Sequence, residues 1–174
     1  MPSASIDKWI AINQRVPGEL YALSAASPLN ATAGSTSKFR GVFVDTVGGS
    51  ESEEPWDIKQ SEKIKPEQMA RFREQLNDRS IVEYGAIAIA ATVLEARSSL
   101  RIGNVHKVGT FNDYALVDAQ SRPAGVIEFK GVTSRYTSDV AAGAREQVGK
   151  ATLSPKRIGV VAFGRPEVRH EVVG

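Results

Sequence analysis

Apolar and polar residues alternate between Phe111 and Gly131 in the manner of a β-hairpin. Two runs rich in apolar and β-branched residues, 113–117 and 125–129, lie on either side of the segment 118–123. That segment contains Asp, Gln, Ser and Pro, a composition typical of a turn. The pattern therefore predicts two antiparallel strands joined by a short polar turn.

The centre of the turn predicts which residues of the two strands face each other. A hairpin symmetric about the middle of the turn opposes Asp113 to Glu128. The same register opposes Asp118 to Pro123, which places Asp118 too far along the strand to replace Asp113. Because side chains of a strand alternate between its two faces, Lys130 shares the face of Glu128. Two carboxylates and one ammonium group therefore converge.

This convergence is unfavourable unless a cation is bound, because neighbouring carboxylates repel and one of them has its pKa raised. Mg²⁺ is commonly held by one or two carboxylates together with waters and phosphate oxygens. A lysine beside it would orient a water molecule or stabilise charge on a phosphorus centre. The alternative is structural: Asp113 ends a strand, and Glu128 and Lys130 form a solvated pair on a sheet face.

A long helix is predicted before the hairpin, over residues 81–96. Ser80 is placed to cap it, and Glu83 three residues later completes a capping box. Apolar and small residues occur nearly all around this helix, which predicts burial against a sheet. Glu83 thus has two interpretations that do not exclude each other: a capping-box residue, and a carboxylate that leans toward the charges of the hairpin.

Periodicity predicts the elements that flank the hairpin. Residues 102–110 alternate as a strand, 157–163 form an apolar strand of the buried type, and 165–174 are a polar tail with a candidate last strand. Residues 138–153 have a helical apolar stripe, and Gln147 lies beside it. Gln147 is either a boundary residue of that helix or a group that reaches the hairpin face.

The amino-terminal region has weaker patterns. Residues 1–37 contain apolar residues for one or two short helices followed by a loop, and 39–44 form a strand. Residues 48–55 are polar and acidic and are expected to be a connector, whereas residues from Pro66 onward have helical spacing. The composition leaves open whether the strand and connector add an edge to a sheet or form a flap over a site.

Composition and charge limit the class of protein. The 174 residues are 41% hydrophobic and 24% charged, as in ordinary globular proteins, and no apolar run is long enough to span a membrane. The absence of cysteine excludes disulfides and thiolate metal sites, and we expect a cytoplasmic protein without a signal peptide. The net charge of +2 conceals an asymmetry: residues 1–96 hold 10 basic and 13 acidic residues, and residues 97–174 hold 12 and 7. The half with the hairpin is the basic half, as a phosphate-binding surface requires.

Over residues 80–163 the predicted order is helix, three strands, helix and strand. An acidic residue on the first helix, Asp113 opening the second strand and Glu128-Phe129-Lys130 ending the third resemble the PD-(D/E)xK nuclease superfamily. The resemblance implies an α/β protein, of the α+β type with a mixed sheet, that has a restriction-endonuclease-like αβββαβ core. Residues 80–174 would form that core, and residues 1–79 an irregular extension packed on it within one folded unit.

The resemblance also implies an enzyme, a metal-dependent endonuclease that hydrolyses nucleic-acid phosphodiester bonds with Mg²⁺ or Mn²⁺. Asp113 and Glu128 would bind the metal, and Lys130 would position or activate the attacking water. Glu83 would assist through a bound water. Gln147 is the candidate for the glutamine found in exonuclease-like branches of the superfamily.

Three basic residues are candidates for contacts with the nucleic-acid backbone, namely Arg135, Arg145 and Lys150. We expect a nucleic-acid partner, DNA in preference to RNA, and no membrane partner. Residues 1–79 are candidates for a homodimer arm or a dock for another protein. The alternative of a different class is a catalytically inactive, nuclease-like module that binds nucleic acid or protein within a larger assembly, because folds are reused for other functions.

Overall fold

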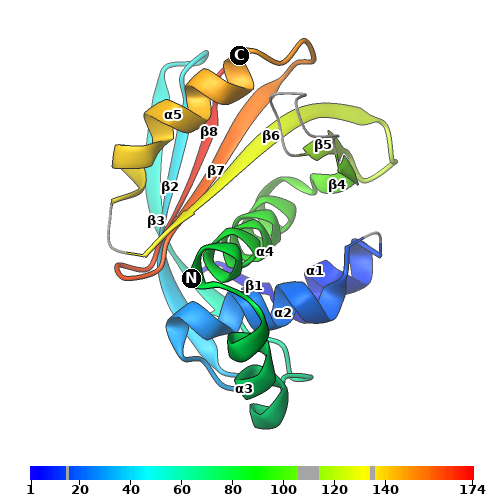
Figure 1. The fold of residues 1–174 in the computed structure, drawn as a ribbon. Helices are drawn as coiled ribbons and strands as arrows, with labels where there is room; N and C mark the ends of the chain where they lie inside the picture. The colour runs from blue at the N-terminus through cyan, green and yellow to red at the C-terminus, as the bar shows by residue number, and fades with distance from the viewer. Residues whose placement is uncertain (15, 106–113, 134–135) are drawn as a thin grey trace.

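One mixed β-sheet contains strands from the amino-terminal and carboxyl-terminal parts of the chain (Figure 1). The computed structural model describes residues 1–14, 16–105, 114–133 and 136–174. Within these residues the sheet is 8-stranded, in the order β1-β3-β2-β8-β7-β6-β5-β4. The strands are β1 (Ser3–Ser5), β2 (Thr36–Asp45), β3 (Ser50–Lys59), β4 (Arg101–Val105), β5 (Tyr114–Val117), β6 (Pro123–Val132), β7 (Lys156–Ala162) and β8 (Glu167–Val172).

One half of the sheet has the order of elements that the sequence predicts. Helix α4 (Asp78–Ser98) precedes β4, β5 and β6, which form an antiparallel meander. Helix α5 (Thr137–Gly149) then connects β6 to β7, and these two strands are parallel. Elements that are consecutive in sequence are therefore neighbours in the sheet, and the mixed α/β architecture is confirmed.

The amino-terminal strands extend this sheet. β8 is antiparallel to β7 and parallel to β2, so it joins the two halves. β2 and β3 form a long antiparallel hairpin, and β1 pairs in parallel with β3 at the edge. The candidate last strand in residues 165–174 is confirmed as β8, and it is an inner strand of the sheet.

Residues 48–55 are not the acidic connector that their composition predicts. They contain the first half of β3, in which Ser52 pairs with Phe43 of β2. The side chains at this end of the hairpin are exposed, so polar residues are favourable there. The two strands are held together by backbone hydrogen bonds and cross-strand side-chain pairs. One such pair is the ion pair between Arg40 and Glu53.

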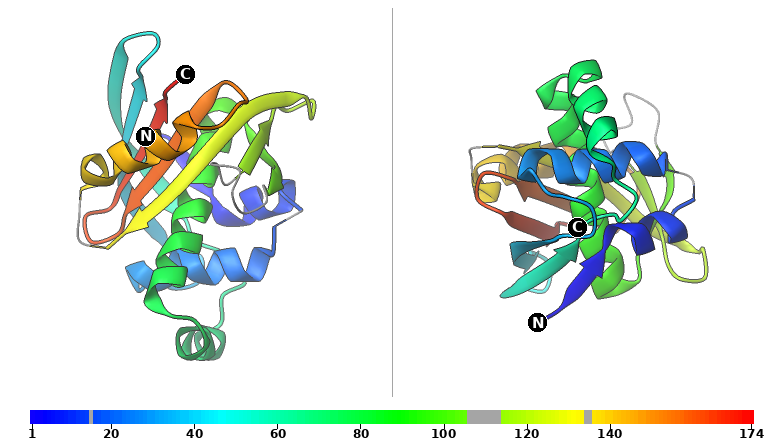
Figure 2. Two further views of the ribbon diagram at one scale, coloured as in Figure 1. Left: turned by 45° about the horizontal axis from the view of Figure 1, so that its top comes forward. Right: turned by 90° about the horizontal axis from the view of Figure 1, so that it is seen from below.

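Helices cover both faces of the sheet (Figures 1 and 2). On one face, α5 contributes Ala144 and Val148 to a small core with Val126 of β6. On the other face, α4 lies against the sheet, and α1 (Ile6–Ile12) and α2 (Gly18–Ala26) pack over it in a larger core. α1 and α2 are the short helices expected in residues 1–37. A 3-10 turn, η1 (Ser27–Leu29), follows α2, and α3 (Pro66–Gln75) precedes α4.

α4 is buried because small and apolar residues surround it, as predicted. Every residue from 85 to 95 is buried. Gly85 permits the close approach of α2, since a Cβ atom there would lie 2.4 Å from the carbonyl oxygen of Ser24. Within the described residues, even this long helix lacks the continuous apolar length that crossing a bilayer requires, and so do the others.

The predicted cap of α4 is wrong. The helix begins at Asp78, and Asn77 caps it by accepting a hydrogen bond of 2.9 Å from the amide of Ser80. Asparagine caps a helix as well as serine does, and an acidic residue in the first turn interacts favourably with the helix dipole. The earlier start moves Glu83 out of the first turn, so Glu83 is not a capping-box residue of this helix.

Candidate active site at the end of strand β6

The hairpin of β5 and β6 has the predicted register in the residues that the structure describes. The pairs are Tyr114 with Ile127, Ala115 with Val126 and Leu116 with Gly125. Asp113, the residue expected opposite Glu128, lies outside the described residues. Glu128 is the next residue of β6 after the described pairs.

The predicted pairing of Asp118 with Pro123 is wrong. The register shifts after Leu116, so that Val117 pairs with Pro123. The shift coincides with Gly125, which has a φ of 109° and lies so close to Pro155 that a Cβ atom would be 2.1 Å from its carbonyl oxygen. The irregularity is a β-bulge that places one extra residue in β6 and none in β5. A hairpin that is symmetric about the middle of its turn has no such extra residue.

Asp118 organises the turn instead of facing a strand residue. Its Oδ1 atom accepts hydrogen bonds from the amides of Gln120 and Arg122, and its Oδ2 atom accepts one from the Arg122 side chain at 2.7 Å. These hydrogen bonds, led by the one from the Arg122 amide, lower the pKa of Asp118. Asp118 therefore has a local structural role.

Glu128 and Lys130 lie on the face of β6 that carries α5. Val126, two residues before Glu128, belongs to the α5 core, whereas Ile127 and Phe129 belong to the core on the α4 side. The side chain of Glu128 is fully buried, and its Oε1 atom lies 2.7 Å from Nζ of Lys130, whose side chain is 40% exposed. The pair is thus not a solvated pair on an open sheet face.

The beginning of α4 lies directly over the end of β6. A Cβ atom on Gly131 would lie 2.4 Å from the carbonyl oxygen of Val82 and 2.9 Å from Cβ of Ala86. Glycine is therefore required next to Lys130 for the helix to approach so closely. The approach brings the first turns of α4, including Glu83, to the same end of β6 as Lys130.

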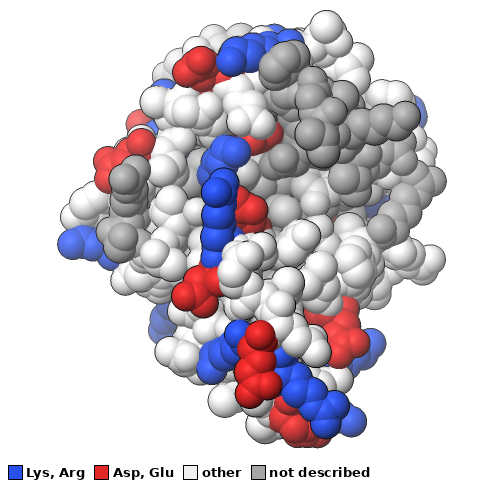
Figure 3. Space-filling view, in the orientation of Figure 1, with Lys and Arg blue, Asp and Glu red and all other residues white. Residues whose placement is uncertain are grey.

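A groove of about 710 Å³ opens between α4, the end of β6 and α5. Lys130 and Glu83 both line it. The remaining lining residues come from the three elements and the residue after β6: Asp78, Arg79, Val82, Gly131, Val132, Thr133, Asp139, Val140, Gly143 and Ala144. Figure 3 shows Lys and Arg side chains next to Asp and Glu side chains in the region between α5 and α4. The groove thus places charges of both signs around the ammonium group of Lys130.

Three charged residues of the groove, Arg79, Asp78 and Asp139, were not predicted from the sequence. Arg79 forms an ion pair of 3.2 Å with the predicted residue Glu83, one turn later on α4. Asp78 and Asp139 lie in the first turns of α4 and α5, so both helices direct an acidic first turn toward the groove. Acidic residues at predicted helix starts were a usable signal, but only the packing of α4 and α5 at one strand end reveals that they share a groove.

The remaining predicted site residues lie along α5 or outside the described part. Gln147 is half-buried and Lys150 follows the helix, where it forms an ion pair of 3.5 Å with Glu146. Arg145 donates hydrogen bonds of 2.5 and 3.2 Å to the buried carboxylate of Glu171, and its pKa is raised by these bonds. None of these three lines the groove, and Arg135 lies outside the described residues.

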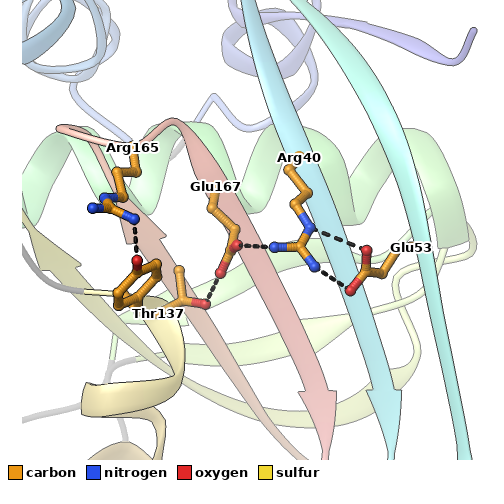
Figure 4. A network of polar contacts seen from close by, with 6 residues as sticks. Arg40, Glu53, Thr137, Arg165 and Glu167 are labelled. Atoms are coloured by element: carbon orange, nitrogen blue, oxygen red, sulfur yellow. Dashed lines mark hydrogen bonds and ion pairs between the residues drawn. The ribbon is translucent and has the colours of Figure 1, made fainter.

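A polar network fixes the start of α5 relative to the sheet (Figure 4). The buried hydroxyl of Thr137, the first residue of α5, donates a hydrogen bond to Glu167 of β8. Glu167 also lies 3.3 Å from the guanidinium of Arg40 on β2, which in turn pairs with Glu53 on β3. The amino-terminal hairpin thereby holds one wall of the groove in position.

The carboxylates of the described residues do not form a metal centre by themselves. Within the described ranges, no three Asp, Glu, His or Cys side chains are grouped closely enough to hold an ion by themselves. Mg²⁺ needs only one or two carboxylates, because waters and substrate phosphates complete its coordination. Of the two predicted metal ligands, Glu128 is described; its carboxylate is fully buried beside Lys130 and is not among the residues that line the groove.

Comparison of the sequence with protein-family models gives no match. Comparison with curated proteins gives no match either.

Proposed function

We propose that the protein is a metal-dependent nuclease of the PD-(D/E)xK type that hydrolyses phosphodiester bonds, in DNA in preference to RNA. The observation that carries the proposal is the fully buried carboxylate of Glu128, paired with Lys130 in the wall of an open groove. Burying a carboxylate is costly, and a charged group retained in such a position beside a groove is a candidate for function.

The order of elements supports the proposal. α4, the meander β4-β5-β6, the crossover helix α5 and the parallel strand β7 follow the αβββαβ order of the superfamily core. The groove lies at the carboxyl-terminal end of β6, past the residues of β6 that have described pairs with β5. In the αβββαβ order, β6 is the third strand, so Lys130 lies near the end of that strand.

Asp113 and Glu128 would hold Mg²⁺ or Mn²⁺. Asp113 is included because the sequence pattern of the hairpin opposes it to Glu128. When bound, the ion would supply Lewis-acid stabilisation of negative charge on the phosphate oxygens. Glu128 contributes a carboxylate that solvent does not reach, so its charge is screened less than that of an exposed carboxylate.

Lys130 is positioned to pair with Glu128 and, at the same time, to contact a substrate in the groove. Its ammonium group has three N–H donors, of which one faces Glu128, and the exposed part of its side chain lines the groove. The other donors would hold the attacking water in line with the phosphorus and stabilise the charge that develops on the phosphate. Glu83, across the groove, would accept a hydrogen bond from a water on that side.

The contacts with the nucleic-acid backbone would come from both sides of the groove. Arg79 lines it, and Lys150 and Arg145 lie farther along α5. Arg145 keeps 41% of its side chain exposed while it pairs with Glu171, so it would contribute charge at the surface. Arg135 is proposed from the sequence alone, and Gln147 would hold a phosphate beyond the end of the groove.

A cleavage assay on plasmid and single-stranded DNA with Mg²⁺ or Mn²⁺ tests the proposal. We expect Lys130→Ala and Glu128→Gln each to reduce the cleavage rate by about 100-fold or more, because the first removes charge stabilisation at the reacting phosphate and the second removes a carboxylate assigned to the metal. The matched control is Lys59→Ala, which removes a lysine from an exposed ion pair with Glu62. Undiminished cleavage by purified Lys130→Ala protein, with the control also active, would overturn the proposal.

A further inference from the structure

A second pocket lies at the opposite end of α4 from the groove. It has a volume of about 240 Å³ and lies between the last turn of α4 and the sheet ends formed by β2, β3, β7 and β8. Val82, in the groove, and Arg97, in this pocket, are separated by about 22 Å along the helix axis at 1.5 Å per residue. The pocket is therefore separate from the proposed nuclease site.

Arg157 brings a positive charge into this pocket without a carboxylate partner among the described residues. It is half-buried at the start of β7, and its guanidinium donates one hydrogen bond, of 3.0 Å, to the carbonyl oxygen of Ala124. Burial lowers the pKa of Arg157. A guanidinium has five N–H donors, so Arg157 has further donors to offer to an acceptor in the pocket.

His170 forms a polar part of the pocket wall on β8. Its residue surface is 7% exposed, and the backbone of Ala90 on α4 lies within hydrogen-bonding reach of its ring. The imidazole stacks on the ring of Phe43, with 5.9 Å between centroids and 10° between planes. An imidazole has two ring nitrogens, so a hydrogen bond with Ala90 leaves the other nitrogen for a ligand in the pocket.

Arg97 adds a second guanidinium on the α4 side. Its Cζ atom lies 3.8 Å from the centroid of the Phe43 ring, a cation–π contact, and one of its nitrogens pairs with Glu54. Phe43 therefore contacts both Arg97 and His170 and holds these side chains at one pocket wall. The charge of Arg157 adds to that of Arg97 near His170.

The acidic residues that line the pocket are engaged elsewhere. Oδ1 of Asp45 accepts hydrogen bonds from the amides of Val47 and Gly48 in the turn between β2 and β3. The carboxylate of Glu171 pairs with Arg145 and Arg169, which lie toward the α5 face of the sheet. Neither carboxylate is paired with Arg157 in the described structure, so the positive charge of that residue is available to an anion.

We propose that this pocket binds a small organic anion, whose carboxylate or phosphate group is held by Arg157 and Arg97 and accepts a hydrogen bond from His170. Planar guanidinium groups match the geometry of both oxyanions. The apolar part of the ligand would contact Leu94, Leu100 and Val172, which also line the pocket. The volume lies below the range of about 300–1,000 Å³ that drug-sized ligands occupy, so the pocket suits a small ligand and excludes a nucleic-acid duplex.

Titration of the wild-type protein with phenyl phosphate and with benzoate, followed by the NMR signals of His170, tests this site. The chain has only two histidines, so the His170 signals are assigned by their loss in His170→Gln. We expect saturable shifts with at least one anion and a rise in the pKa of His170 on binding, because the anion offsets the charges of Arg97 and Arg157. Tighter binding of phenyl phosphate would identify a phosphate ligand, and tighter binding of benzoate a carboxylate ligand. Benzyl alcohol, which lacks the charge, is expected not to bind.

Arg157→Met is expected to weaken anion binding by about tenfold or more, since it removes a charged hydrogen-bond donor. Arg71→Met, on the exposed surface of α3, is the matched control and should bind as the wild type does. Arg157→Lys keeps the charge without the forked donors and should also bind more weakly, which provides a test if Arg157→Met does not fold. Absence of saturable shifts with both anions, equal binding of benzyl alcohol, or unchanged affinity in the Arg157 variants would overturn the proposal.

Discussion

The Nζ atom of Lys130 lies 2.7 Å from Oε1 of Glu128, a carboxylate whose side chain has no exposed surface. Removing the ammonium group leaves the charge of Glu128 buried with less compensation, which is more costly than removing the whole pair. We expect Lys130→Met to reduce the free energy of unfolding by about 1–3 kcal/mol. The double variant Glu128→Gln/Lys130→Met should recover most of that loss, as measured by urea unfolding at pH 7.

The exposed pair of Lys59 and Glu62 provides the control for this stability measurement. Its side chains are 50% and 66% exposed, so the ion pair is screened by solvent. Lys59→Met should change the free energy of unfolding by less than about 1 kcal/mol. If Lys130→Met is no more destabilising than Lys59→Met, the carboxylate of Glu128 does not depend on Lys130 for its charge balance.

Binding of Mn²⁺ distinguishes a metal site from an inactive nuclease-like module. Calorimetry of the wild type should show one bound ion per chain, and Glu128→Ala should abolish it, because Glu128 is one of the two carboxylates assigned to the metal. Glu62→Ala, which removes an exposed carboxylate, should leave the binding unchanged. An absence of binding heat in the wild type would argue against the metal site and favour the inactive module.

The register of the β5–β6 hairpin could be predicted because it depends on local information. Alternation of apolar residues and a polar turn determine the pairing of Tyr114 with Ile127, and three consecutive pairs agree with it. The prediction fails at Asp118, where the close approach of Pro155 to Gly125 changes the turn. That contact joins residues far apart in sequence, so no local pattern contains it.

The other differences between the sequence-based predictions and the structure also arise from contacts between residues that are far apart in sequence. Residues 48–55 resemble a loop in composition, but pairing with β2 makes them a strand. Lys130 was predicted from its spacing to Glu128, whereas the burial of Glu128 depends on how α5 packs on β6. The pocket around Arg157 and His170 is formed by five separate elements and has no signature in the sequence.

Gly131→Ala tests whether the approach of α4 to β6 forms the groove. The added methyl group would lie 2.4 Å from the Val82 carbonyl oxygen, a backbone atom that cannot move without the helix. We expect a loss of about 2–4 kcal/mol in the free energy of unfolding, together with reduced cleavage. The control is Gly143→Ala in α5, where a Cβ atom meets nothing within 4 Å and should stabilise the helix by about 0.5–1 kcal/mol.

His170 should make the stability of the protein depend on pH between 6.5 and about 4. Burial, with a further contribution from the charges of Arg97 and Arg157, lowers the pKa of this residue from 6.5 to about 4. Within this range the unfolded chain binds a proton at His170 that the folded protein does not, so stability falls as the pH decreases and the contribution is fully present above pH 6.5. The shift corresponds to about 3 kcal/mol at its limit. Urea unfolding of the wild type and of His170→Phe, which keeps an aromatic ring against Phe43, should show the wild type losing stability relative to the variant as the pH falls from 6.5 toward 4. Parallel pH profiles for the two proteins would show that His170 is not held neutral in the folded state.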